Sequence, residues 1–211
     1  MKVENKAIKF DKMVREREDD ELGLFEKYDE ILSGIRRKII NHNAIKVLDI
    51  GCGTGNLCGD LSEEIYILGI DQSLEMISLA KKKYESMDFK LGSFLDKPFV
   101  EHDFDIVVTT YSFHSLNDEE KKEAINNMLG FLKDNGKIII VDFMFKNDLE
   151  KEERKKELLD KKRKDLWEVI DYKYYTNVEE FKKYIQDLGY KFKCEHKVNF
   201  TWIVEIEKEL V

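Results

Sequence analysis

Three alternating glycines follow a short apolar run near residue 50. Gly51, Gly53 and Gly55 come directly after residues 47–50. Glycine lets the backbone turn sharply and lets a ligand lie against it, because no Cβ occupies that space. In the dinucleotide pattern G-x-G-x-x-G the third glycine would fall at position 56, where this chain has Asn56. The spacing therefore favours a small-molecule cradle that differs from a pyrophosphate site, with Asp49 available for a cationic group.

A second acid lies at the end of the next apolar run, residues 67–70. Asp71 would stand beside the glycine turn if the two runs are neighbouring parallel strands, because their carboxyl ends then meet at one edge of the sheet. There it could accept hydrogen bonds from the two hydroxyls of a ribose. The alternative is that Asp71 only favours the start of a helix near Leu74.

Aromatic residues and a histidine follow a later apolar run, residues 104–110. Tyr111 and Phe113 would lie at the same edge of the sheet, where their ring faces tolerate a partial positive charge. His114 could remove a proton from an attacking group, because histidine titrates near neutrality. A hydrogen-bonded structural histidine is the alternative for this position.

These segments resemble the class I S-adenosylmethionine-dependent methyltransferases. More narrowly, the chain is similar to the YrrT-like methyltransferases at residues 25–32, 111–116, 174–176 and 200–202. The resemblance implies methyl transfer from S-adenosylmethionine to a small-molecule acceptor, with S-adenosylhomocysteine as the product. It also implies an α/β fold: a Rossmann-like doubly wound seven-stranded sheet, mostly parallel, with an antiparallel C-terminal hairpin strand and an N-terminal helical cap.

The resemblance and the local chemistry together suggest which residues hold the cofactor. These are Asp49, Gly51, Gly53, Gly55, Asn56, Asp71, Gln72, Met76, Ser93, Phe94 and Thr110. In the related proteins, residues at the positions of Gln72 and Met76 flank the adenine. Ser93 departs from the pattern, because an acid usually bonds the adenine amino group there. We therefore expect adenine to be held mainly by backbone and by Phe94 and Leu95.

Tyr111 and His114 are the predicted catalytic residues, and six others are predicted to bind the acceptor. These six are Arg17, Phe25, Tyr28, Phe113, Trp167 and Tyr175. Arg17 stands where the likeness leads us to expect a tyrosine; its guanidinium could meet the cofactor carboxylate or an acidic acceptor, or lie in solvent. The aromatic side chains could close over an acceptor or simply pack beneath surface helices. The sequence leaves open whether sulfur, nitrogen or oxygen is methylated.

The hydrophobic pattern predicts the elements that position these residues. Helical spacing predicts a helix over residues 22–41, and alternating strand and helix signals follow, including a helix from the glycine turn to Glu64. Two alternating runs at residues 190–206 predict an antiparallel hairpin. We expect a single domain over residues 1–211, with a helical cap (1–43), a cofactor-binding core (44–143), a helical insertion or lid (144–176) and a C-terminal helix and hairpin (177–211).

The composition argues against several other classes of protein. The chain has 211 residues, and its net charge of -8 disfavours an extended nucleic-acid surface. No apolar run approaches the roughly 20 residues needed to cross a membrane. The three cysteines have no C-x-x-C spacing and the four histidines are scattered, so we predict no metal site.

We expect a cytoplasmic protein that is a monomer or homodimer. Two alternatives to an active methyltransferase remain. One is a regulatory module that binds S-adenosylmethionine without turnover. The other is an NAD(P)-dependent oxidoreductase, against which Asn56 and the absence of a Y-x-x-x-K pair both count.

Overall fold

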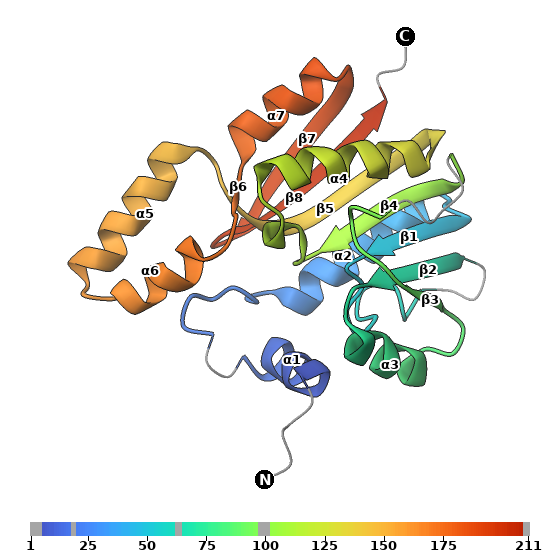
Figure 1. Cartoon of the computed structure of the whole chain (residues 1–211), viewed down its shortest axis with the longest axis horizontal. Coiled ribbons are helices and arrows are strands. Elements are labelled where there is room, and N and C mark those ends of the chain that lie inside the picture. Colours follow the sequence, from blue (N-terminus) through green and yellow to red (C-terminus); the bar gives the residue numbers. More distant parts are fainter. Residues whose placement is uncertain (1–5, 18–19, 62–64, 97–101, 209–211) are drawn as a thin grey trace.

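The computed structural model describes residues 6–17, 20–61, 65–96 and 102–208, which form a central β-sheet with helices on both faces (Figure 1). The strands lie in the order β3-β2-β1-β4-β5-β8-β7, and β6 pairs with the end of β5. Their bounds are β1 Lys46–Ile50, β2 Tyr66–Asp71, β3 Asp88–Leu91, β4 Phe104–Thr110, β5 Leu132–Phe145, β6 Thr176–Asn177, β7 Tyr190–Val198 and β8 Thr201–Lys208.

The sheet is parallel except at its C-terminal end. Strands β1 to β5 run in one direction, whereas β8 is antiparallel to both β5 and β7. This confirms the predicted mostly parallel sheet with an antiparallel C-terminal hairpin. The strand order reverses between β1 and β4, and ligands of such sheets bind outside the carboxyl ends of the strands at that point.

The helices cover both faces of the sheet. Their bounds are α1 Lys6–Glu16, α2 Tyr28–Asn41, α3 Leu74–Lys83, α4 Asp118–Phe131, α5 Asp148–Asp160, α6 Lys164–Asp171 and α7 Val178–Asp187, with a short 3-10 helix, η1, at Phe113–Ser115. Apolar side chains of α4 and α7 pack on one face, in a buried cluster with Leu48 and Val107. Side chains of α2 pack on the other face, with Val47 and Ile106. The strands between them are therefore apolar on both sides, as their sequences suggested.

The prediction of a helix after the glycine turn was wrong. The described residues 56–61 form turns, and residues 62–64 lie outside the described part of the chain. The ring of Tyr84, just after α3, packs against this segment: a Cβ added at Gly55 would stand 2.9 Å from the ring, and one at Gly59 would overlap it. Two glycines weaken the helix propensity of the segment, and the close approach of this ring needs both of them.

The N-terminal cap also differs in detail from the prediction. Helix α1 was not predicted, and α2 begins at Tyr28 and not at residue 22. The carboxylate of Asp20 accepts hydrogen bonds from Leu24 N (2.6 Å) and Phe25 N (2.9 Å), which holds the intervening residues in turns. The charged insertion forms two helices, α5 and α6, which project to one side of the sheet (Figure 1).

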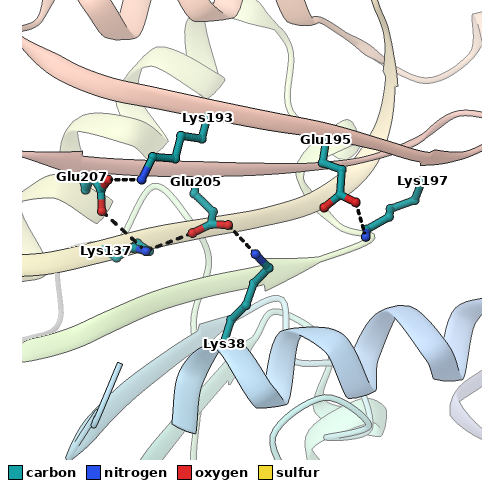
Figure 2. Close-up of polar contacts among 7 residues, drawn as sticks. All are labelled: Lys38, Lys137, Lys193, Glu195, Lys197, Glu205 and Glu207. Carbon is teal, nitrogen blue, oxygen red and sulfur yellow. Dashed lines mark hydrogen bonds and ion pairs between the residues drawn. The ribbon is translucent and has the colours of Figure 1, made fainter. Parts of the chain in front are cut away.

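Charged side chains line one face of the C-terminal hairpin (Figure 2). Glu205 of β8 accepts hydrogen bonds from Lys38 of α2 (2.7 Å) and Lys137 of β5 (3.0 Å), and Lys193 of β7 pairs with Glu207 at 2.6 Å. Burial alone would raise the pKa of Glu205, but the hydrogen bonds from both lysines lower it. This network fastens the end of α2 to β5 and β8 and gives the edge of the sheet a charged surface, which discourages further strand pairing.

Candidate active site

A cleft runs along the carboxyl ends of β1, β2 and β4. It comprises two cavities of about 240 Å³ and about 140 Å³ that share Gly51, Asp71 and Ser112 in their linings. Of the predicted site residues, the larger cavity is lined by Gly51, Asp71, Gln72, Ser93 and Phe94. The smaller cavity is lined by Tyr28, Gly51, Gly53, Asn56, Asp71, Met76, Thr110 and Tyr111. The cleft lies at the point of strand reversal, where the fold places ligands.

The glycine turn forms the floor of the cleft. Gly51, Gly53 and Gly55 all have left-handed backbones, with φ of 70°, 54° and 80°, a region that favours glycine. A Cβ at Gly51 would overlap the side chain of Ser112. A Cβ at Gly53, in contrast, would meet nothing within 4 Å. Gly53 is therefore the position where the turn leaves room for a ligand.

The carboxylate of Asp71 holds the turn in place from the end of β2. Its Oδ2 accepts a hydrogen bond from Gly53 N (2.9 Å), and its Oδ1 accepts one from Ser73 N (2.8 Å). Asp71 also lines both cavities. It stands at the middle of the cleft, where both its oxygens retain lone pairs for further donors.

Asp49 lies behind the turn as a buried carboxylate with few partners. It has no exposed surface, and neither of its oxygens has a hydrogen-bond partner of ordinary geometry in the described chain. Burial raises its pKa to about 7; the nearby thiol of Cys58 lowers the pKa, and the charge of Asp71 raises it further. A ligand ammonium group that approached from the glycine turn would favour the charged form of Asp49.

The larger cavity contains the residues after β3. The hydroxyl and the backbone N–H of Ser93 both donate to Asp96 Oδ2, at 2.9 Å and 2.7 Å. Phe94 is buried, and its carbonyl accepts a hydrogen bond from Asn127 Nδ2 (2.9 Å). The loop therefore contains an acid, Asp96, three residues after Ser93, where the resemblance leads us to expect one. Asp96 was not predicted as a site residue, because the spacing of residues in a loop does not determine where a side chain points.

Tyr111 forms the wall of the smaller cavity at the end of β4. Its φ of 54° is unusual for a residue with a large side chain, and such strain is commonly found at functional sites. Its ring packs against Tyr28 (5.4 Å between centroids), Phe25 (5.5 Å) and Phe143 (5.3 Å). Burial raises the pKa of Tyr111, and it raises that of Tyr28 to about 12. Both tyrosines therefore keep their protons near neutral pH.

His114 lines neither of the two cavities but lies beside this aromatic wall. Its Nδ1 is 2.6 Å from Oδ1 of Asp142, a residue of β5 that is almost fully buried. Its ring lies 5.0 Å from the ring of Phe143 and 6.1 Å from that of Tyr175. Asp142 was not among the predicted site residues.

The remaining predicted acceptor residues are dispersed. Phe113 is fully buried and packs against Phe94 and Phe181, beneath the cleft. Trp167 is buried under Lys155 of α5. Arg17 is exposed, at the end of α1. Of the residues predicted to bind the acceptor, Tyr28 lines the cleft and Phe25 and Tyr175 stand in the aromatic wall behind it.

Helix α1 crosses the glycine turn. The carboxylate of Asp11 accepts hydrogen bonds from the Thr54 hydroxyl, from Asn56 Nδ2 (3.1 Å) and from Lys83 Nζ (2.9 Å). Burial would raise the pKa of Asp11, but the hydrogen bonds from Thr54 and Lys83 lower it. Phe10 of the same helix lines the smaller cavity. Asn56, the residue that breaks the dinucleotide pattern, is therefore a contact for α1.

Within the described ranges, no group of three or more His, Cys, Asp or Glu side chains is placed to hold a metal ion. A search of the same ranges finds no helix both long enough and apolar enough to cross a membrane.

This strand order, with an antiparallel C-terminal hairpin, a glycine turn after β1 and an acid at the end of β2, is the arrangement that the resemblance to class I S-adenosylmethionine-dependent methyltransferases implies. The model of the methyltransferase domain family matches residues 41–192, and the chain belongs to that family. It is 36% identical over 203 residues to an uncharacterized methyltransferase of Alkaliphilus oremlandii, which covers 94% of this chain and 92% of the relative. A second uncharacterized methyltransferase, from Staphylococcus carnosus, is 32% identical, with 96% and 95% covered.

Solved structures share the fold. Magnesium protoporphyrin IX methyltransferase from Synechocystis PCC 6803, solved with bound S-adenosylhomocysteine, aligns with a TM-score of 0.68 at 15% identity, covering 97% of this chain and 100% of that one. The YcgJ protein from Bacillus subtilis aligns with a TM-score of 0.65 at 17% identity, covering 84% and 98%. The chain is an enzyme of this family.

Proposed function

We propose that this enzyme methylates a small-molecule acceptor and releases S-adenosylhomocysteine. The observation that carries the proposal is the open space at Gly53, in a cavity that the glycine turn and Asp71 line. When bound, S-adenosylmethionine supplies the methyl group on a sulfonium. The protein orients donor and acceptor and excludes water from the path between them.

The proposed cofactor contacts follow the length of the cleft. The glycine turn receives the amino-acid end of S-adenosylmethionine; it is shaped by Gly51, Gly53 and Gly55, and Asp49 lies behind it. Asp71 accepts hydrogen bonds from the ribose. The adenine occupies the larger cavity beside Gln72, Ser93 and Phe94. Asn56, Met76 and Thr110 complete the lining of the smaller cavity. Because Met76 lines the smaller cavity, we propose that it contacts the methionine half and not the adenine.

The acceptor is proposed to lie against the aromatic wall. Tyr28, Phe25 and Tyr111 pack edge to face or tilted, with centroids 5.4–6.0 Å apart, and Tyr111 faces the cleft. Such rings offer apolar surface and tolerate the partial positive charge of a methyl group in transfer. Helices α1, α5 and α6 stand near this wall and would limit the acceptor to a small molecule.

The cofactor site can be tested with a matched pair of glycine variants. Gly53 and Gly189 both have positive φ, and a Cβ at either position would meet no atom within 4 Å. Alanine therefore imposes a similar backbone strain of about 1–2 kcal/mol at each. We expect Gly53→Ala to weaken S-adenosylmethionine binding at least about tenfold by calorimetry, because the methyl group enters the ligand's space, and Gly189→Ala to leave the affinity unchanged.

The same binding assay separates the alternatives. Wild-type protein should be stabilised against heat by S-adenosylmethionine and S-adenosylhomocysteine and not by NAD or NADP. Stabilisation by the dinucleotides alone, or equal affinities in the two glycine variants, would overturn the proposed site. Release of S-adenosylhomocysteine with small thiols, phenols and amines then distinguishes an enzyme acting on small molecules from a module that only binds the cofactor.

A further inference from the structure

A further cavity of about 310 Å³ lies outside the cleft, where α4, α5 and α7 begin. Each of these helices lines it with residues of its first turn, among them Lys121, Lys151 and Glu180. The last residue of β5, Phe145, and the first residue of β6, Thr176, complete this part of the lining. The cavity shares no lining residue with either cavity of the cleft, so it is a separate site.

Aromatic rings connect this cavity with the back of the cleft. Tyr175 lines it, and the ring of Tyr175 packs on those of Phe145 (5.7 Å between centroids) and Phe143 (5.5 Å). Phe143 in turn packs on Tyr111 at 5.3 Å, and Tyr111 lines the smaller cavity of the cleft. A molecule in the new cavity would therefore contact the far side of the aromatic wall and not the path of the methyl group.

Lys121 brings a buried positive charge to the cavity. Its side chain is 6% exposed, and its Nζ donates a hydrogen bond to the carbonyl of Tyr174. The carboxylate of Asp118 is 3.8 Å from Nζ, which is too long for a hydrogen bond of ordinary geometry. An ammonium group has three N–H donors, so these contacts leave donors for a ligand. Burial lowers the pKa of Lys121, although the charges of Asp118 and Asp142 raise it, and a bound anion would stabilise the charged form.

Thr176 and Lys151 favour the same kind of ligand. Thr176 is 5% exposed, and its Oγ1 is buried with no hydrogen-bond partner among the residues that the structure describes. Such a hydroxyl costs free energy unless a ligand or water satisfies it. Lys151 is half-buried, and its positive charge is close enough to lower the pKa of Lys121. The N-terminal ends of three helices add partial positive charge, so the inner part of the cavity favours an anion.

The acids that line the cavity limit the charge of that anion. Asp118, Asp148 and Glu180 are all exposed, so water and salt screen them more than the less exposed Lys121 and Lys151. Three lysines and three acids line the cavity in total, and their formal charges cancel. This balance favours one negative charge over two. The cavity is also lined by four aromatic rings, those of Phe145, Tyr175, Phe181 and Tyr184.

We propose that this cavity is a second binding site, which takes a small carboxylate with one negative charge and an apolar body. The carboxylate accepts hydrogen bonds from Lys121 Nζ and the Thr176 hydroxyl and pairs with Lys151. The apolar body lies against the rings of Phe145 and Tyr175. The site is independent of the proposed methyl transfer, because it shares no lining residue with the cleft.

Titration of nitrogen-15-labelled wild-type protein with 3-phenylpropanoate, followed by NMR, tests the site. We expect saturable shifts of the amide signals of Lys121, Lys151 and Thr176, with a Kd of roughly 1–10 mM, as is usual for a ligand of this size. The uncharged 3-phenylpropanamide should bind at least about tenfold more weakly, because it cannot pair with the ammonium groups. Phenyl phosphate, which is largely a dianion above neutral pH, should also bind more weakly, because the acids around the cavity repel its second charge.

Substitutions test which side chains hold the carboxylate. Lys121→Met and Lys151→Met each remove an ammonium group, keep much of the apolar stem and should weaken binding of 3-phenylpropanoate about tenfold. Thr176→Val keeps the shape of the side chain and should weaken it about threefold. Lys182→Met is the matched control, because Lys182 is exposed on α7 and does not line the cavity. Its affinity should equal that of the wild type.

Several outcomes would overturn the proposal. The site is refuted by a lack of saturable shifts near Thr176, by shifts centred on the glycine turn at residues 51–55, or by an equal loss of affinity in Lys182→Met. Equal affinities for the carboxylate and the amide, or tighter binding of phenyl phosphate, refute the class of ligand. Should Lys121→Met fail to fold, the comparison of ligands on the wild type and the Lys151→Met variant still decide.

Discussion

Asp49→Asn tests whether ionisation of the buried carboxylate behind the glycine turn lowers the free energy of unfolding, and whether the cofactor reduces that loss. Burial raises the pKa of Asp49 from its ordinary 3.8 to about 7. Between these values the folded protein holds a proton that the unfolded chain has lost. The stabilising contribution of this group is therefore complete below about pH 4 and is lost as the pH rises to about 7. Each tenfold change in proton affinity is worth about 1.4 kcal/mol, so the full loss is roughly 4 kcal/mol.

Urea unfolding of the ligand-free protein, followed by circular dichroism, measures this effect. From about pH 5 to about pH 8 the wild type should lose roughly 3 kcal/mol relative to Asp49→Asn, because the amide has no proton to lose. Asp134→Asn is the control, since this exposed acid has a lowered pKa and is ionised throughout the range. Parallel stability curves for wild type and Asp49→Asn would refute the reasoning. Saturating S-adenosylmethionine should flatten the wild-type slope, because its ammonium group favours the charged carboxylate.

Three further substitutions have distinct expected outcomes. Asp71→Asn should weaken S-adenosylmethionine binding about 10- to 100-fold by calorimetry, because hydrogen bonds to a charged acceptor contribute about 1.5–3 kcal/mol; an unchanged affinity would mean that Asp71 serves only the turn. Asp11→Asn should speed hydrogen exchange in α1 by about tenfold, since the ion pair with Lys83 is lost, and unchanged exchange would show that α1 is held by other contacts. Phe113→Ala should cost about 3–5 kcal/mol in urea unfolding, as expected for a fully buried ring; a loss below about 1 kcal/mol would contradict its placement in the core.

The fold could be predicted because its signals are local. The apolar runs of β4 and β5, the glycine turn and the alternating residues of the C-terminal hairpin each lie within a few residues of one another. Contacts between distant segments could not be predicted in the same way. Asp142 is 28 residues from His114, and Asp11 is 43 residues from Thr54. Only the packed sheet brings these pairs together.

Two predictions of secondary structure, the helix after Gly55 and the start of α2 at residue 22, were wrong because of tertiary contacts. The turns after Gly55 depend on the ring of Tyr84, which reaches them from the end of α3. The late start of α2 depends on Asp20, whose carboxylate competes for the backbone N–H groups of Leu24 and Phe25. In both places the hydrophobic periodicity was present, but a side chain outside the periodic segment decided the backbone conformation.

The attachment of α1 to the glycine turn constrains the order in which a ligand can enter. Asp11 bonds Thr54 and Asn56, so α1 covers part of the cleft at the glycine turn. A nucleoside entering from the Ser93 side meets no such barrier, whereas entry past Phe10 requires several hydrogen bonds to break together. Passage of a ligand at this end of the cleft would therefore require α1 to move away from the glycine turn.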